Sequence, residues 1–209
     1  MTLIQAEDRA SASQQAANRI ATALARDLAT KPLASFIASG GTTPIECYRA
    51  LAKAELDWSR VHVIPSDERE VPLDDDQRNS KMLRQSLRQC YAGSCVIHEI
   101  EDFNALPKPA AITLLGMGED GHFASIFPDI SELNRAVDLS TTDSLLAVQT
   151  TASALRRTTL TLSALCNSQQ VLILAYGEKK LGLLTQPDDL PIQHVLAQTK
   201  TPVEIIWSP

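Results

Sequence analysis

Residues 33–54 read LASFIASGGTTPIECYRALAKA and contain the unit from which the fold can be predicted. The apolar run 33–38 is typical of a buried strand, and the two glycines that follow it allow a tight turn. Pro44 then stands where the first turn of a helix begins, ahead of a segment without a helix breaker. The stretch therefore predicts a strand, a glycine turn and a helix.

The same alternation continues along the chain. Helices are expected at 8–29, 45–54 and 79–90, where apolar residues recur at helical spacing. Short apolar runs predict further strands at 61–65, 95–100, 111–116, 145–149, 171–176 and 203–207. Strands that alternate with helices indicate an α/β fold, in which a doubly wound, mainly parallel sheet carries helices on both faces in a Rossmann-like, three-layer arrangement.

The composition is typical of one globular domain. The 209 residues are 44% hydrophobic and 21% charged, and no linker or repeat divides them, so we expect a single domain spanning 1–209. The chain shows neither a secretory pattern nor the roughly 20 apolar residues of a membrane helix, which favours a cytoplasmic protein without membrane contact. Four scattered cysteines lack metal-ligand spacing, and we expect them to be reduced and structural: Cys47, Cys90, Cys95 and Cys166.

The net charge limits the kinds of partner. Nineteen Lys and Arg against 25 Asp and Glu leave a formal charge of −6. Nucleic-acid binding needs clustered basic residues that displace counterions, so no nucleic-acid partner is expected. An anionic ligand must instead be held by a few local cations and by backbone N–H groups.

The turn after the first strand is one candidate for ligand binding. Gly40 and Gly41 let the backbone approach a ligand closely, and the next helix N-terminus presents free N–H groups that suit a phosphate. The flanking Ser39 and Thr42 add hydroxyl groups. Glycine turns are common, however, and the same residues also fit a simple strand-to-helix turn with a threonine cap.

A second candidate is the segment 115–125, LGMGEDGHFAS, which follows the expected strand at 111–116. Open α/β folds bind ligands at the carboxyl ends of their strands. There, His122 could accept a proton from water, and Asp120 could orient its ring. A lone histidine is more often structural, but the glycine loop and the nearby carboxylate favour a functional reading.

Three other groups of charged residues could take part. Asp67 and Arg69 follow the strand expected at 61–65 in what is expected to be a charged loop, where they could contact substrate hydroxyls and an anion. The pairs at 156–157 and 179–180 contain Arg157 and Lys180. Each pair could equally be surface charge, but an acidic protein that binds an anion needs local cations, and arginine grips phosphate well.

These residues, in this order, resemble the 6-phosphogluconolactonase family and its relatives, the glucosamine-6-phosphate deaminases and isomerases. The resemblance runs from residue 39 to 180 and is most specific in the block 115–128, LGMGEDGHFASIFP. Shorter matches are SGGT with Pro44, the segment 67–69 with Val71, Asn79, Arg157 ahead of TLT, and Gly177 with Lys180.

The resemblance implies hydrolysis of 6-phosphogluconolactone to 6-phosphogluconate in the oxidative pentose phosphate pathway, without a metal or cofactor. The implied partner is a small phosphorylated sugar lactone, and a monomer is favoured. His122 would be the general base and Asp120 the group that orients it. The implied donors and ligands for the phosphate, the ring and the oxyanion are Ser39, Gly40, Gly41, Thr42, Asp67, Arg69, Asn79, Gly118, Arg157 and Lys180.

The sequence departs from the family pattern at two places named here, and two other functions are alternatives to lactone hydrolysis. Arg78 replaces the serine that usually precedes Asn79, and the segment 101–110 is too short for the helix that most relatives insert there. A deaminase is one alternative, but that class typically carries a glutamate where this chain has Phe127. The other alternative is a non-catalytic sugar-phosphate-binding module, which usually accompanies a DNA-binding segment that is not visible here.

Overall fold

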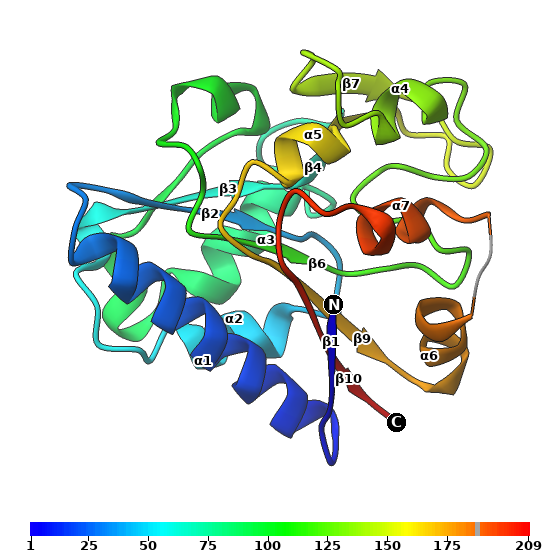
Figure 1. Cartoon of the computed structure of the whole chain (residues 1–209). Helices are drawn as coiled ribbons and strands as arrows, with labels where there is room; N and C mark the ends of the chain where they lie inside the picture. Colours follow the sequence, from blue (N-terminus) through cyan, green and yellow to red (C-terminus); the bar gives the residue numbers. More distant parts are fainter. Residues whose placement is uncertain (187–188) are drawn as a thin grey trace.

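A parallel sheet forms the middle layer of the computed structural model, which describes residues 1–186 and 189–209 (Figure 1). Within those residues it has seven strands in the order β1-β10-β9-β6-β2-β3-β5, and all neighbours pair in parallel. Its strands are β1 (Thr2–Gln5), β2 (Ala34–Ala38), β3 (Val61–Pro65), β5 (Val96–Ile97), β6 (Ile112–Leu115), β9 (Val171–Tyr176) and β10 (Val203–Ser208).

Helices cover both faces of this sheet (Figure 1). One face carries α1 (Arg9–Leu28), α2 (Ile45–Leu51) and α3 (Asn79–Leu87). The other carries α4 (Leu133–Val137), α5 (Leu162–Leu165), α6 (Glu178–Thr185) and α7 (Pro191–Ala197). Short 3₁₀ turns lie at η1 (Trp58–Arg60), η2 (Cys90–Ser94) and η3 (Ile100–Ala105).

Strand β2 shows why the inner strands of the sheet are mostly apolar. Phe36 packs into the core cluster on the side of α1, and Ile37 packs into the cluster on the opposite face. A parallel strand that is covered on both faces needs apolar side chains at every position rather than at alternate ones. The predicted fold class, a doubly wound and mainly parallel sheet with helices on both faces, is confirmed.

A second, antiparallel sheet was not predicted. It has the order β4-β8-β7 and consists of β4 (Asp67–Arg69), β8 (Arg157–Leu160) and β7 (Leu145–Val148). The expectation of a charged loop at 67–69 is therefore wrong, as is the placement of 145–149 in the main sheet. The charged residues of β4 are able to form a strand because the folded chain supplies partners for their side chains.

Some boundaries also differ from expectation. The strand expected at 95–100 is reduced to Val96–Ile97, and the chain then turns into η3. Helix α2 ends at Leu51 rather than Ala54, and Pro44 occupies its N-cap position. Strand β1 was missed because its four residues are mostly exposed and carry no clear apolar pattern.

The order of the strands fixes the place of the functional site. From β2 the chain runs outward through β3 to β5, whereas from β6 it runs in the other direction through β9 to β10. The reversal lies between the neighbouring strands β2 and β6. Open α/β sheets bind their ligands outside the carboxyl ends of the strands at such a reversal. The two glycine segments predicted to bind a ligand directly follow these two strands.

Two histidines meet at the β5 edge of the main sheet. Nδ1 of His62 lies 3.0 Å from Nε2 of His98, and the two rings are 4.9 Å apart between centroids. Burial, followed by the proximity of His98, lowers the pKa of His62 from its ordinary value of 6.5. The folded protein therefore binds a proton at His62 less readily than the unfolded chain does.

We expect this pair to make the fold sensitive to acid. As the pH falls through about 6.5, the unfolded chain takes up the His62 proton first, so the free energy of unfolding should decrease. Urea unfolding between pH 7.5 and pH 5 measures the effect, with His62→Gln as the comparison. The variant should lose less stability on acidification than the parent protein. Equal losses in the two proteins would show that the histidine pair contributes nothing.

Candidate active site

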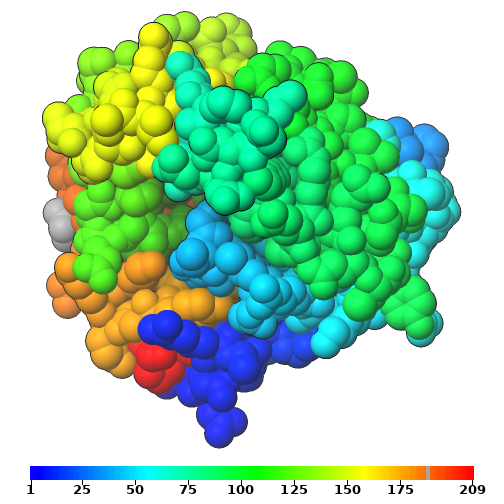
Figure 2. Space-filling view, turned by 180° about the vertical axis from the view of Figure 1, so that it is seen from behind, coloured from blue at the N-terminus to red at the C-terminus, as the bar shows by residue number. Residues whose placement is uncertain are grey.

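A pocket of about 190 Å³ opens at the reversal between β2 and β6. In Figure 2 the surface is hollowed where the light-blue turn after β2, the teal segment after β4 and the green segment after β6 meet. The lining residues are Ser39, Gly40, Gly41, Thr43, Asp67, Arg69, Asn79, Gly116, Met117, Gly118, His122, Ala124 and Arg157. Every site residue proposed from the sequence lines this pocket except Thr42, Asp120 and Lys180.

His122 and Asp120 form a hydrogen-bonded pair in the loop after β6. Oδ1 of Asp120 lies 2.6 Å from Nδ1 of His122 and also accepts the backbone N–H of His122 at 3.2 Å. Because a carboxylate accepts hydrogen bonds and does not donate them, Nδ1 carries the proton in the neutral ring. Nε2 then keeps the lone pair that can accept a proton. Asp120 thus orients His122 although it does not line the pocket itself.

Gly118 is required by the close approach of this pair. A Cβ atom placed on Gly118 would lie 2.2 Å from Nδ1 of His122 and 2.3 Å from Oδ1 of Asp120, distances that no side chain can adopt. The backbone N–H of Gly118 donates to the carbonyl of His122 at 2.9 Å. This N–H is therefore already in use, and Gly118 contributes space for the pair rather than a free donor.

The turn after β2 offers donors that are free. The backbone N–H groups of Gly40 and Gly41 donate to no acceptor within residues 1–186 and 189–209. Gly41 has φ = 81°, a conformation that favours glycine, and a Cβ on Gly40 would lie 2.3 Å from the amide of Asn79. Ser39 holds the two glycine loops together, because its hydroxyl accepts the N–H of Gly116 at 3.1 Å.

Asp67 is a buried carboxylate with several partners. Its oxygens accept the hydroxyl of Ser125 at 2.6 Å and that of Ser66 at 3.1 Å. The amide of Asn79 donates to its backbone oxygen at 2.8 Å, and Nη1 of Arg157 lies 3.9 Å from its carboxylate. Asp67 therefore holds an amide and a guanidinium group in place at the pocket. Direct contact between Asp67 and a substrate hydroxyl stays a prediction.

Arg157 is the most deeply placed cation of the pocket. Its side chain is only 13% exposed, and its Nε is buried without a hydrogen-bond partner among the described residues. Burial lowers the pKa of Arg157, the carboxylate of Asp67 opposes this effect, and the nearby charge of Arg69 adds to it. An arginine stays charged throughout the accessible pH range. The pocket thus contains a partly desolvated positive charge with an unused donor.

Glu68 and Arg78 belong to a buried network of ion pairs and hydrogen bonds next to the pocket. Glu68 is buried, and its carboxylate accepts the N–H groups of Asn79 and Ser80 at 2.8 Å each, which caps the start of α3. Arg78 points toward Glu68 at 3.8 Å and donates to Glu99 at 2.5 Å. The residue that departs from the family pattern is therefore part of a buried ion network and does not line the pocket.

Loss of Arg78 should destabilise the protein. Arg78→Met keeps the length of the side chain but leaves the buried Glu68 without its cation, so we expect the free energy of unfolding to fall by about 2–4 kcal/mol. Urea unfolding measures this. Arg84 donates to the same Glu99 from a more exposed position, and Arg84→Met should cost about 1 kcal/mol or less. If the two variants were equally stable, the buried network would not have the importance assigned to it.

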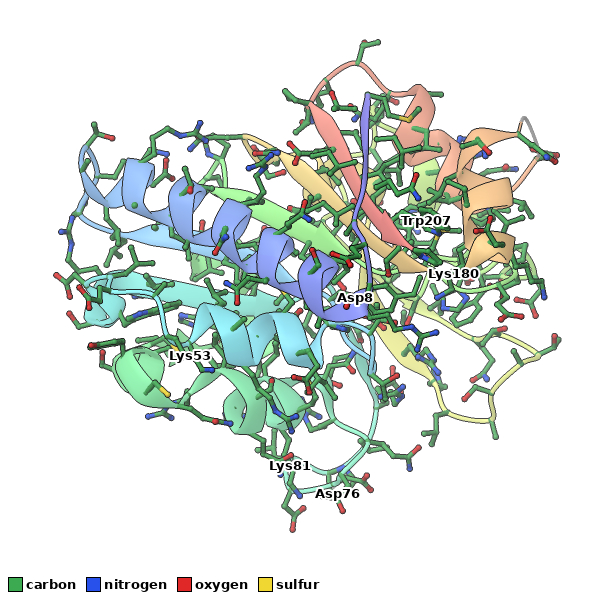
Figure 3. All side chains as sticks on the ribbon, turned by 90° about the horizontal axis from the view of Figure 1, so that it is seen from below. Asp8, Lys53, Asp76, Lys81, Lys180 and Trp207 are labelled. Carbon is green, nitrogen blue, oxygen red and sulfur yellow. The ribbon has the colours of Figure 1, made fainter. Side chains whose placement is uncertain are left out.

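Lys180 does not line the pocket that contains His122. It is on α6, close to the end of β10, where the indole of Trp207 donates to the carbonyl that precedes α6 at 2.9 Å (Figure 3). Burial lowers the pKa of Lys180, and the charge of Glu119 opposes this shift. Its neighbour Lys179 pairs with Glu119 at 2.6 Å. Contact between Lys180 and a ligand phosphate remains a prediction.

A larger hollow of about 730 Å³ lies between the first turns of α1 and the length of α2. It includes Thr42 and shares Thr43 with the candidate pocket. Its cations Arg9, Arg49 and Lys53 are exposed, and Lys53 is labelled in Figure 3. None of the described residues that line it is a histidine. Because this hollow lacks an acid–base pair among those residues, the smaller pocket with His122 is the candidate active site.

Sequence reasoning missed part of the supporting structure. Ser66 and Ser125, which bind the Asp67 carboxylate, were not singled out, and Phe127 was noted only as a difference from deaminases. In the structure the ring of Phe127 stacks on His122 with 4.0 Å between centroids. Ser125 and Phe127 lie in the block 115–128, but sequence alone does not show which of its residues face one another.

No group of three or more His, Cys, Asp or Glu side chains is placed to hold a metal ion in residues 1–186 and 189–209. In the same part of the chain no helix is long and apolar enough to cross a membrane.

Fold and site together define a doubly wound α/β protein with a histidine–carboxylate pair and two arginines at the reversal of its sheet. Residues 7–207 match the family model described as glucosamine-6-phosphate isomerases/6-phosphogluconolactonase. The chain belongs to this family.

Individual relatives agree with this assignment. The chain is 34% identical to a 6-phosphogluconolactonase of Caulobacter vibrioides over 92% of this chain and 91% of the relative. It is 32% identical to one of Mesorhizobium japonicum over 97% and 93%. Its structure is similar to the crystal structure of a 6-phosphogluconolactonase from Shewanella baltica, with a TM-score of 0.94, 33% identity and coverage of 100% and 98% of the two chains.

Proposed function

We propose that this protein hydrolyses 6-phosphogluconolactone to 6-phosphogluconate, as in the oxidative pentose phosphate pathway. The observation that carries the proposal is the His122–Asp120 pair, 2.6 Å apart, in a pocket that also contains Arg69 and Arg157. The relatives named as 6-phosphogluconolactonases support it, because they match nearly the whole chain at 32% and 34% identity.

His122 is proposed to activate the attacking water. Nε2 takes a proton from the water as its oxygen attacks the lactone carbonyl, and Asp120 stabilises the imidazolium that forms. The tetrahedral intermediate then breaks its bond to the ring oxygen, which receives the proton back from His122. The product is the open-chain acid, which ionises and releases one proton to solution.

Arginine and backbone donors are proposed to bind the negative charges. The Nε of Arg157 is buried and has no partner among the described residues, which suits a phosphate oxygen. The charge of Arg69 is near enough to lower the pKa of Arg157, so the two cations lie close together. The free N–H groups of Gly40 and Gly41 suit either the phosphate or the developing oxyanion. Lys180 is a further candidate ligand, close enough to Glu119 for the two charges to interact.

The deaminase alternative is less well supported. Opening of an amino sugar and loss of its amine need additional acid–base groups, and the position next to His122 is occupied by an apolar ring, Phe127. A lactone is an activated ester and needs only one base and an oxyanion site. The composition of the pocket therefore favours lactone hydrolysis.

Product analysis tests the proposal. The protein is incubated with freshly generated 6-phosphogluconolactone and, separately, with glucosamine 6-phosphate, and 6-phosphogluconate and ammonia are quantified. We expect 6-phosphogluconate to form faster than in the spontaneous reaction and no ammonia to appear. Ammonia release without lactone turnover would assign the deaminase reaction. Saturable binding of 6-phosphogluconate with neither reaction would assign a non-catalytic binding module.

A further inference from the structure

Phe127 lies behind His122 rather than in the pocket. Its side chain is buried at 6% exposure, and it is not one of the lining residues. The phenyl and imidazole rings are 4.0 Å apart between centroids and are inclined by 27°, which is a stacked arrangement. Phe127 thus covers one face of the ring whose nitrogen is proposed to accept the proton of the attacking water.

The hydrogen bond from Asp120 is not enough to fix the imidazole. It holds Nδ1, but the ring of a histidine rotates in a broad torsional well, so the direction of Nε2 varies with small rotations. Gly118 only leaves room at the Nδ1 edge, since a Cβ atom there would approach Nδ1 to 2.2 Å, and so it does not restrain the ring. The flat face of Phe127 supplies the remaining restraint, which is the plane of the ring.

The same phenyl ring also lies near the buried cation. The guanidinium carbon of Arg157 is 5.4 Å from the ring centroid, within the range of a cation–π contact. This distance is longer than the 4.0 Å between the rings of Phe127 and His122. Arg157 is additionally attracted by Asp67, whereas nothing else among the described residues covers the face of His122 with a ring.

We propose that Phe127 is a positioning residue that fixes the plane of the His122 imidazole and so aims Nε2 at the attacking water. The inference rests on the proposed lactonase function and deepens it. Orientation of a base matters when the proton is transferred and not when the substrate binds. Loss of the flat ring therefore lowers kcat and leaves KM nearly unchanged.

Kinetics of three variants test the first consequence. Phe127→Leu removes the ring but keeps an apolar side chain, and we expect kcat to fall about 10- to 100-fold, with KM changed less than about threefold. Phe127→Tyr keeps the ring and should restore most of kcat. Phe103→Leu is the matched control, because Phe103 is similarly buried in the same core cluster and also lies against a cation, Lys108, but the ring that stacks on His122 is that of Phe127.

Several kinetic results would contradict the proposal. A rise in KM at unchanged kcat would mean that Phe127 acts through Arg157 and not through His122. Equal losses of kcat in Phe127→Leu and Phe103→Leu would mean that both rings only stabilise the fold. If Phe127→Leu does not fold, Phe127→Met takes its place, because the flexible methionine side chain fills irregular gaps.

Nuclear magnetic resonance tests the positioning independently of any activity. In the parent protein the ring current of Phe127 should shift the His122 imidazole protons upfield, and the ¹⁵N shifts should report a single tautomer with the proton on Nδ1. In Phe127→Leu the upfield shift should vanish and the ring signals should broaden or average. Sharp His122 signals with the same tautomer and no ring-current change would overturn the positioning role even if the protein is a lactonase. A parent protein with the expected signals but no lactonase activity would instead contradict the proposed function alone.

Discussion

Replacing His122 by asparagine is expected to lower kcat for lactone hydrolysis by about 10²- to 10⁴-fold, the usual contribution of a general base. Asparagine keeps a polar planar group against Asp120 and Phe127 but cannot accept the proton of the attacking water. Initial rates of acid release from 6-phosphogluconolactone, corrected for spontaneous hydrolysis, measure the effect.

Two controls make the His122→Asn result specific. Binding of 6-phosphogluconate should change by less than about threefold, because the base contributes to the transition state and not to binding of the product. His194→Asn, an exposed histidine of α7 outside the pocket, should retain full activity. If His122→Asn kept the parent rate, another group would have to be the base.

Addition of a single methyl group at Gly118 should have the second largest effect. The new Cβ of Gly118→Ala would overlap the His122–Asp120 pair at 2.2 Å and 2.3 Å, so the pair must move. A displacement of about 1 Å in a catalytic group can cost about 10²-fold in rate, and we expect a loss of that size in kcat. Steady-state kinetics of the folded variant measure it.

Gly182→Ala is the matched control for this prediction. Gly182 lies in α6, and a Cβ atom added to it would meet no described atom within 4 Å, so this position should accept alanine freely. Because alanine favours helices, this variant should be slightly more stable, by about 0.5–1 kcal/mol, with unchanged kcat. Full activity in Gly118→Ala would mean that the pair does not occupy the catalytic position.

The inner strands of the main sheet could be predicted from the sequence because they are buried on both faces, whereas the mostly exposed edge strand β1 could not. The continuous apolar run of β2 and the glycine turn after it are local signals, whereas the order of the strands, and with it the reversal between β2 and β6, is set by tertiary pairing. The antiparallel sheet could not be predicted in this way. Strand β4 carries Asp67 and Glu68, whose burial depends on partners such as Ser125 and Ser80 that lie far away in sequence.

The candidate site could likewise be predicted from the sequence only where its residues are neighbours in the chain. The pairing of His122 with Asp120 agrees with their short spacing in one loop, whereas the position of Arg157 beside Asp67 depends on the pairing of β8 with β4. The stacking of Phe127 on His122 also escaped prediction, because an apolar residue in a sequence is indistinguishable from ordinary core. Local spacing thus indicates the acid–base pair, and tertiary pairing supplies the groups that surround it.

The proposed function is tested by comparing kcat/KM for acid release from 6-phosphogluconolactone with kcat/KM for the unphosphorylated gluconolactone. We expect turnover of the phosphorylated lactone well above the spontaneous rate and a kcat/KM at least about 10²-fold lower without the phosphate, since Arg157 would then lack its proposed charge-assisted contacts. A rate with 6-phosphogluconolactone no faster than spontaneous hydrolysis would contradict it.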